Sequence, residues 1–197
     1  MDISTAINNL KDNIKKIYVS SKETKNKNIY RGHLRSISTD IEDEIAYFIM
    51  SILSEGYKIY LDPSIYIDDQ NHRPDLLILN NENEIKCLIE IKSNMGWCRD
   101  AKDVIKKISE NDKLYKRERK LLCKFSTTEN NDVYYNDVKL FLISLTSGNC
   151  CNSNHEANKI KAEKENCNYY MLFDGWYNEL ENRDIEEFAN KLSDICK

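Results

Sequence analysis

The feature that most constrains this chain is a pair of apolar runs separated by a short polar segment, in the stretch HRPDLLILNNENEIKCLIEIKS. Leu- and Ile-rich runs joined by NNEN predict two strands, over 73–79 and 85–92, that pair antiparallel through a turn. Asp75, Glu90 and Lys92 lie inside or beside these runs. Charged groups at such positions are costly unless they are paired or bound to a metal.

Alternation along the second strand places Leu88, Glu90 and Lys92 on one face. If the first strand pairs with it through the turn, Asp75 lies close to Glu90 and Lys92. Two carboxylates held together raise each other's pKa unless a cation neutralises them. Oxygen ligands suit a hard ion such as Mg²⁺, and a lysine beside the ion can orient a water for attack on phosphorus. The set therefore predicts the equipment for hydrolysing a phosphodiester.

The remaining periodicity predicts helices and strands on both sides of this pair. Apolar spacing predicts a helix over 3–18, and Thr39 and Glu42 form a capping-box pattern for a second helix that ends at Gly56. We expect further helices over 101–122, 155–166 and 183–196. We expect further strands over 57–61, 65–67, 138–145 and 169–173.

The motif RPD, followed by fourteen residues and then EIK, resembles the PD-(D/E)XK nuclease superfamily, which includes many restriction endonucleases. The resemblance covers about residues 38–145. It implies an α/β single domain, with a central mixed sheet and an αβββαβ restriction-endonuclease-like core flanked by helices. It also implies a Mg²⁺-dependent deoxyribonuclease, with Mn²⁺ as an alternative ion, that leaves a 3′-hydroxyl and a 5′-phosphate. Asp75, Glu90 and the backbone carbonyl of Ile91 would bind the metal, and Lys92 would assist the nucleophilic water.

Members of this superfamily often carry one more acidic residue on the helix before the sheet, and here Glu42 and Glu44 compete for that role. Glu42 has apolar residues three, four and seven positions later, so it lies on the edge of the buried face. Glu44 lies on the opposite edge. We therefore prefer Glu42 as a catalytic and metal-binding residue, while its capping interpretation stays open.

Five residues are candidates for contact with nucleic acid: Arg31, Arg35, Arg73, Trp97 and Arg99. Each has a structural alternative. The segment holding Arg31 and Arg35 is equally compatible with a solvated surface, and Trp97 with covering the edge of the core. Arg73 would pair with Asp75 if the charged set were only structural. His72 can reach the same site, but the sequence gives it no fixed partner.

Charge and composition leave a nucleic-acid partner open. The 197 residues carry 29 Lys and Arg against 33 Asp and Glu, a formal net charge of −4. Binding depends on local patches, and residues 101–124 hold the strongest basic concentration, including KRERK over 116–120. A solvated face is the more ordinary interpretation of KRERK.

Length and cysteine usage predict one cytoplasmic domain. We divide the chain into an N-terminal helix and loop (1–37), a catalytic core (38–145) and a C-terminal strand and helices (146–197). The seven Cys include no CxxC pair, which indicates reduced cysteines of a cytoplasmic protein. No apolar run is long enough to span a bilayer, so we expect no membrane partner. The resemblance makes DNA the expected partner and a homodimer plausible.

Two other functions are compatible with the same sequence. A non-catalytic nucleic-acid-binding or regulatory module can retain the nuclease fold and lose productive metal binding. An ordinary α/β interaction protein can carry ion pairs at a sheet edge, in which case Glu90→Gln would leave stability and function almost unchanged. The complete Asp75, Glu90 and Lys92 set favours the enzyme over both.

Overall fold

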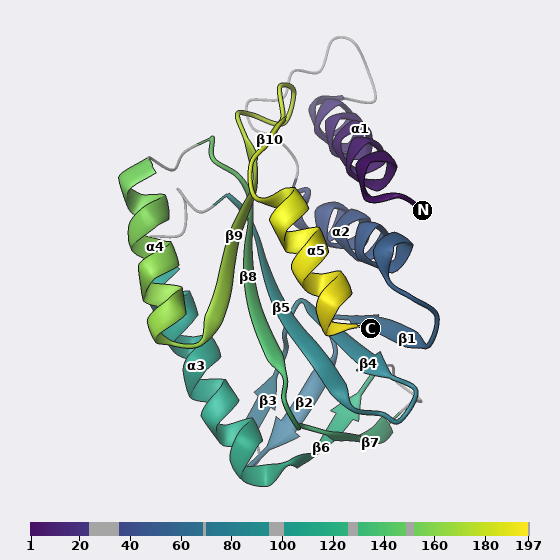
Figure 1. Cartoon of the computed structure of the whole chain (residues 1–197), viewed down its shortest axis with the longest axis vertical. Coiled ribbons are helices and arrows are strands. Elements are labelled where there is room, and N and C mark those ends of the chain that lie inside the picture. Colours follow the sequence, from purple (N-terminus) through teal and green to yellow (C-terminus); the bar gives the residue numbers. More distant parts are fainter. Residues whose placement is uncertain (24–35, 69, 95–100, 126–129, 149–151, 197) are drawn as a thin grey trace.

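The protein is described by a computed structural model that covers residues 1–23, 36–68, 70–94, 101–125, 130–148 and 152–196. These residues form a single α/β fold with five helices around a mixed sheet (Figure 1). The helices are α1 (Ile3–Lys22), α2 (Ser38–Ile52), α3 (Ala101–Glu118), α4 (Asn152–Lys164) and α5 (Ile185–Ile195). The mixed sheet flanked by helices confirms the predicted class.

The central sheet has six strands in the order β1-β4-β5-β8-β9-β10. Their bounds are β1 (Tyr57–Leu61), β4 (Leu76–Asn80), β5 (Ile85–Asn94), β8 (Lys139–Thr146), β9 (Cys167–Asp174) and β10 (Glu181–Asn182). β4 pairs antiparallel with both β1 and β5, whereas β5, β8 and β9 run parallel. β5 and β8 are therefore central strands, and their near-continuous apolar sequences are typical of strands buried on both faces.

A second, four-stranded antiparallel sheet has the order β3-β2-β6-β7. Its strands are β2 (Ser64–Ile67), β3 (Gln70–His72), β6 (Lys120–Lys124) and β7 (Asn130–Tyr134). In Figure 1 it lies behind the lower part of the central sheet. In it, β2 lies between β3, which precedes Asp75, and β6, which follows α3.

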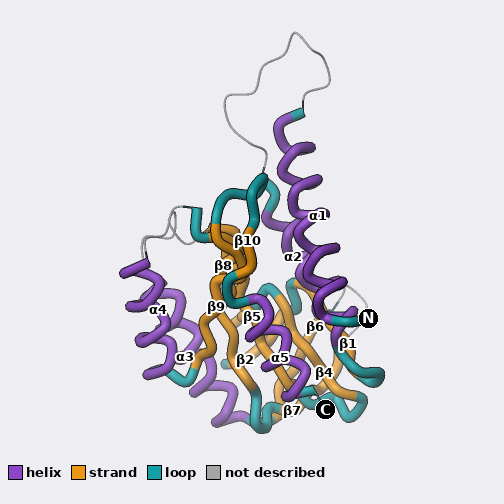
Figure 2. Tube along the Cα trace, turned by 45° about the horizontal axis from the view of Figure 1, so that its top comes forward, coloured by secondary structure: helices purple, strands orange, loops and turns teal. Residues whose placement is uncertain are grey.

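Two apolar cores lie on opposite faces of the central sheet. One unites the apolar stripes of α1, α2 and α5 with side chains such as Ile89 and Phe141. The other unites α3, α4 and the inner face of the second sheet with Leu77, Leu88 and Leu142. Figure 2 shows α1, α2 and α5 on one side and α3 and α4 on the other. The alternation predicted for β5 is confirmed from Cys87 onward, because Ile89 and Leu88 belong to different cores.

Several predicted boundaries are wrong. The helix predicted over 101–122 ends at Glu118, because Arg119 adopts a left-handed backbone (φ 58°) and the chain continues as β6. The capping box is absent: α2 begins at Ser38, its N-cap is Ile37, and no side chain caps it. That helix ends at Ile52, and Gly56, at φ 100°, instead forms the turn into β1.

The first strand of the opening pair begins later than predicted. β4 starts at Leu76, so Arg73 and Asp75 precede it instead of lying within it. β3, β6, β7 and β10 were not predicted at all. Among the described helices, none combines the length and the apolar character that crossing a bilayer requires.

Candidate functional site

A β-bulge sets the pairing register between β4 and β5. Leu79 pairs with Ile85 but Ile78 pairs with Cys87, so Lys86 has no partner in the ladder. Beyond the bulge Leu76 pairs with Ile89, and the next position places Asp75 opposite Glu90. Without the extra residue, Asp75 would lie opposite Ile89, on the other face of the sheet. Bulges of this kind re-aim side chains next to functional sites.

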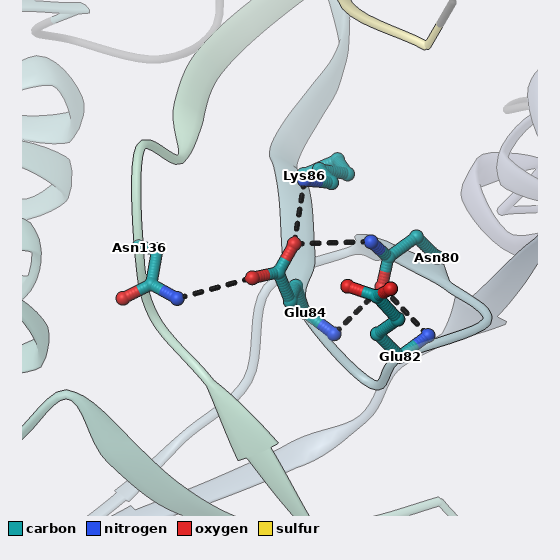
Figure 3. A network of polar contacts seen from close by, with 5 residues as sticks. All are labelled: Asn80, Glu82, Glu84, Lys86 and Asn136. Atoms are coloured by element: carbon teal, nitrogen blue, oxygen red, sulfur yellow. Dashed lines mark hydrogen bonds and ion pairs between the residues drawn. The ribbon is translucent and has the colours of Figure 1, made fainter.

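Polar contacts hold the turn at the other end of this strand pair (Figure 3). Asn80 Oδ1 accepts hydrogen bonds from the backbone N–H groups of Glu82 and Glu84, at 3.0 and 2.9 Å. Glu84 in turn accepts from Lys86 Nζ at 2.7 Å and from Asn136 Nδ2 at 3.2 Å. The contacts engage the bulged residue itself, so they stabilise the register that places Asp75 opposite Glu90.

At the opposite end, β5 extends past the first residue of β4, so Ile91 pairs with Ile143 of β8 but has no partner in β4. The N–H of Ile91 donates to Asp75 Oδ2 at 2.5 Å. The backbone carbonyl of Asp75 accepts from the N–H of Asp62 at 3.0 Å. Asp75 is therefore fixed from both its side chain and its main chain. A buried N–H without an acceptor is costly, which gives this geometry its energetic reason.

The ammonium group of Lys92 lies between the two carboxylates. Its Nζ is 3.5 Å from Asp75 Oδ2 and 3.3 Å from Glu90 Oε2. It also donates to the backbone carbonyl of Ile91 at 3.1 Å. The predicted convergence of Asp75, Glu90 and Lys92 is thus present at the carboxyl end of a parallel strand, where open α/β sheets commonly bind ligands.

Burial and mutual repulsion shape the electrostatics of this site. Burial, followed by the charge of Asp75, raises the pKa of Glu90 to about 7, although Lys92 opposes the rise. Burial acts against the charge on Lys92, but Asp75 and Glu90 outweigh it and raise the pKa of the ammonium. One ammonium thus compensates two carboxylates only in part. The site favours additional positive charge.

The two acidic candidates on α2 face different neighbours. Glu44 accepts a hydrogen bond from Asn13 Nδ2 of α1 at 2.9 Å, so its carboxylate is engaged away from β5. Burial raises the pKa of Glu42, and the negative charges of Asp75 and Asp62 raise it further. Of the two carboxylates, Glu42 is therefore the one that interacts electrostatically with Asp75. The capping role of Glu42 is wrong, because α2 begins at Ser38 and no side chain caps it. Its role as a site carboxylate stays a prediction.

Asp62 is a residue that sequence reasoning missed. It follows β1 in a left-handed conformation (φ 47°), and its backbone N–H holds Asp75. Its charge also acts on Glu42. In the sequence, the Asp-Pro pair after the strand indicates a turn. It does not indicate that this turn contacts Asp75.

The donor set has the chemistry for a hard divalent cation, but it is not a compact cage. Asp75, Glu90 and the carbonyl of Ile91 supply oxygen ligands, and a cation would offset the repulsion that raises the pKa of Glu90. Across the described ranges, no three His, Cys, Asp or Glu side chains converge closely enough to hold an ion. Glu42 is near enough to act electrostatically without completing such a group.

The other predicted contacts have mixed outcomes. Arg31, Arg35, Trp97 and Arg99 lie outside the described residues. Arg73 is exposed, and none of the described carboxylates forms an ion pair with it. Asp75 therefore pairs with Lys92 and not with Arg73, contrary to the structural alternative.

The basic segment KRERK is engaged in local ion pairs. Lys116 lies 2.6 Å from Asp112, Arg117 lies 2.5 Å from Asp68, and Lys120 lies 2.6 Å from Asp132. The three basic side chains are exposed, although Asp112 is buried, and this favours the interpretation of the segment as a solvated surface.

Comparison with models of protein families and with curated proteins finds no match for this sequence.

Proposed function

We propose that this protein is a metal-dependent nuclease that hydrolyses phosphodiester bonds of DNA, as a restriction-type or defence endonuclease. The observation that carries the proposal is the convergence of Asp75, Glu90 and Lys92 at one end of β5, with Lys92 Nζ within 3.5 Å of both carboxylates. Two acidic groups and a lysine in one partly buried site are expensive to assemble for packing alone.

The order of elements supports a restriction-endonuclease-like core. Without the strands of the second sheet, the chain runs α2-β1-β4-β5-α3-β8, which follows the αβββαβ order that the resemblance implies. β1, β4 and β5 form an antiparallel set, and β8 returns parallel to β5 after α3. In this arrangement Glu90 and Lys92 lie on the central strand β5, and Asp75 immediately precedes β4.

The residues have distinct proposed roles. Asp75, Glu90 and the carbonyl of Ile91 would hold Mg²⁺, with Glu42 as a further carboxylate from α2. When bound, Mg²⁺ would lower the pKa of a water ligand and stabilise negative charge on the phosphate. Lys92 donates to the same oxygens, so its ammonium can orient the water that attacks phosphorus and then stabilise the charge that develops there.

One observation favours a second candidate, a non-catalytic nucleic-acid-binding or regulatory module. Lys92 already bridges Asp75 and Glu90, and a bridging ammonium stabilises two carboxylates without any metal. Such a module would bind nucleic acid with weak or no Mg²⁺ affinity.

Cleavage assays separate these candidates. The purified protein is incubated with plasmid DNA, phage DNA and an RNA transcript, in Mg²⁺ and in EDTA. We expect Mg²⁺-dependent cleavage of DNA that Lys92→Ala lowers by about 10²–10⁴-fold. The matched control is Lys139→Ala on β8, whose ammonium pairs with the exposed Asp137, and it should cleave as the unmodified protein does.

If no nucleic acid is cleaved, calorimetric titration with Mg²⁺ distinguishes the nuclease from the binding module. Absence of cleavage, together with a Mg²⁺ affinity that Asp75→Ala leaves unchanged, would remove the nuclease from consideration and favour the binding module. Cleavage of RNA alone would keep the chemistry but change the substrate.

A further inference from the structure

A pocket of about 410 Å³ opens beside the candidate site, between α3, the face of β5 and the end of β3. Glu90 contributes to its wall, so the pocket and the site share a residue. Pockets of roughly 300–1,000 Å³ are the size that buries small molecules. This volume is on the scale of one nucleotide and cannot admit a base-paired duplex.

The wall of the pocket combines positive charge, side-chain amides and apolar surface. Arg73 and Lys107 supply positive charge, and neither forms an ion pair with any described carboxylate. The positive charge of Lys107 also opposes the rise in the pKa of Glu90. Asn71 and Asn111 supply amides that both donate and accept hydrogen bonds.

The floor is apolar, and one polar atom in the wall lacks a partner. Leu88, Ile108 and Leu140 contribute apolar surface. His72 packs its ring edge-on against Tyr115, with 5.7 Å between the ring centroids. Its Nε2 is buried, and among the described residues nothing hydrogen-bonds to it. Because this nitrogen is buried away from the open space, polar recognition of a ligand falls to Arg73, Lys107 and the two amides.

We propose that this pocket receives one nucleotide of the DNA substrate, with its base extruded from the stack beside the phosphate to be cleaved. The inference rests on the proposed nuclease function and adds how the substrate is held. A nucleotide has an anionic phosphate for Arg73 and Lys107, a polar base edge for the two amides and flat faces for the apolar floor. Enzymes that act on a base extrude it from the stack into a closely fitting pocket, and the same placement would hold one nucleotide of a cleaved strand.

The first experiment titrates the protein with each of the four 2′-deoxynucleoside 5′-monophosphates and follows ¹⁵N-labelled side-chain amides by NMR. We expect saturable shifts at Asn111 with at least one nucleotide. Asn111→Phe fills the pocket and should weaken that binding at least tenfold. The matched control is Lys113→Phe, an exposed position two residues away that does not line the pocket, and it should bind normally. Failure of all four nucleotides to bind, or equal binding by both variants, overturns the proposal.

The second experiment distinguishes a nucleotide within DNA from a free one. A duplex that the protein cleaves is prepared with 2-aminopurine at successive positions and bound in Ca²⁺ to prevent cleavage. We expect fluorescence to rise at one position, and the rise to disappear with Asn111→Phe. If mononucleotides bind but no position brightens, extrusion is wrong and the ligand is a free nucleotide.

The two proposals fail separately. Nucleotide binding without cleavage of any DNA would remove the nuclease function, and extrusion with it, while leaving a nucleotide site. Cleavage without nucleotide binding would remove the pocket proposal alone.

Discussion

Ionised Glu90 destabilises the folded state, yet this is the form that a proposed metal site needs. Its carboxyl group lies half-buried beside Asp75, and burial is the main cause of its raised pKa. Ionisation of Glu90 therefore weakens the folded state at alkaline pH, whereas a proposed metal site needs the ionised form. Asp75 differs, because its side chain also accepts the N–H of Ile91.

Substitution of the two carboxylates should consequently have opposite effects on stability. At pH 8 we expect Glu90→Gln to raise the free energy of unfolding by about 1 kcal/mol, since a neutral amide replaces a destabilised charge. Asp75→Ala should lower it by about 1–3 kcal/mol, because the N–H of Ile91 loses its acceptor. Both variants should lose cleavage. Urea unfolding at pH 8 measures the difference, and equal losses in the two variants would contradict it.

The junction of α3 and β6 shows how one backbone conformation decides an element. Arg119 adopts φ 58°, its N–H donates to the carbonyl of Tyr115, and its own carbonyl accepts from the N–H of Tyr135. The left-handed residue ends the helix and redirects the chain into the second sheet. A non-glycine residue in this conformation costs about 1–2 kcal/mol.

Relief of this cost should stabilise the protein. Arg119→Gly is expected to raise the free energy of unfolding by about 0.5–1 kcal/mol, after the greater freedom of glycine in the unfolded chain is subtracted. Lys113→Gly, in the exposed middle of the same helix, should lower it by about 1 kcal/mol. Thermal and urea unfolding test the pair, and destabilisation by both substitutions would show that Arg119 is not strained.

On the scale of the whole molecule, the two cores share one sheet and are joined at its edge by a buried polar contact. His155 of α4 is 3% exposed, and its Nε2 lies 3.7 Å from Asp184 Oδ2 in the segment before α5. Asp184 also accepts the N–H of Met171 in β9. Burial lowers the pKa of His155 and the charge of Arg183 lowers it further, whereas Asp184 raises it.

Acid should therefore weaken the whole fold through His155. Its pKa is lower in the folded state than the ordinary value of 6.5, so between these values the unfolded state binds the proton and the folded state does not. The contribution of His155 to stability is complete above about pH 6.5 and falls below it, by at most about 1.4 kcal/mol per pH unit. Glu156 and Lys159 are the other charged groups that act on His155.

Comparison of the protein with His155→Gln isolates this effect. The free energy of unfolding, measured in urea from pH 7.5 to 5.5, should decrease less steeply with acid in the variant. Glu90 contributes the opposite slope, because its raised pKa favours the folded state as pH falls toward 4.5, but it does so equally in both proteins. Identical slopes in the two proteins would contradict the assignment.

The paired strands and the charged residues beside them follow from the sequence alone. Leu and Ile runs separated by a short polar turn can bury their side chains only as neighbouring strands, and alternation placed Glu90 and Lys92 on one face. β1 was predicted with its observed bounds, Tyr57–Leu61. These features are local, because each depends on residues a few positions apart.

The bulged register that brings Asp75 opposite Glu90, and the course of the second sheet, depend on the tertiary structure. The bulge at Lys86 moves Asp75 to the face of Glu90, yet no residue pattern marks the extra residue. β6 escaped prediction because Leu122 is 48% exposed beside buried neighbours, which hides the alternation of a strand. Such choices depend on contacts between segments far apart in the chain, and those contacts outweigh local propensity.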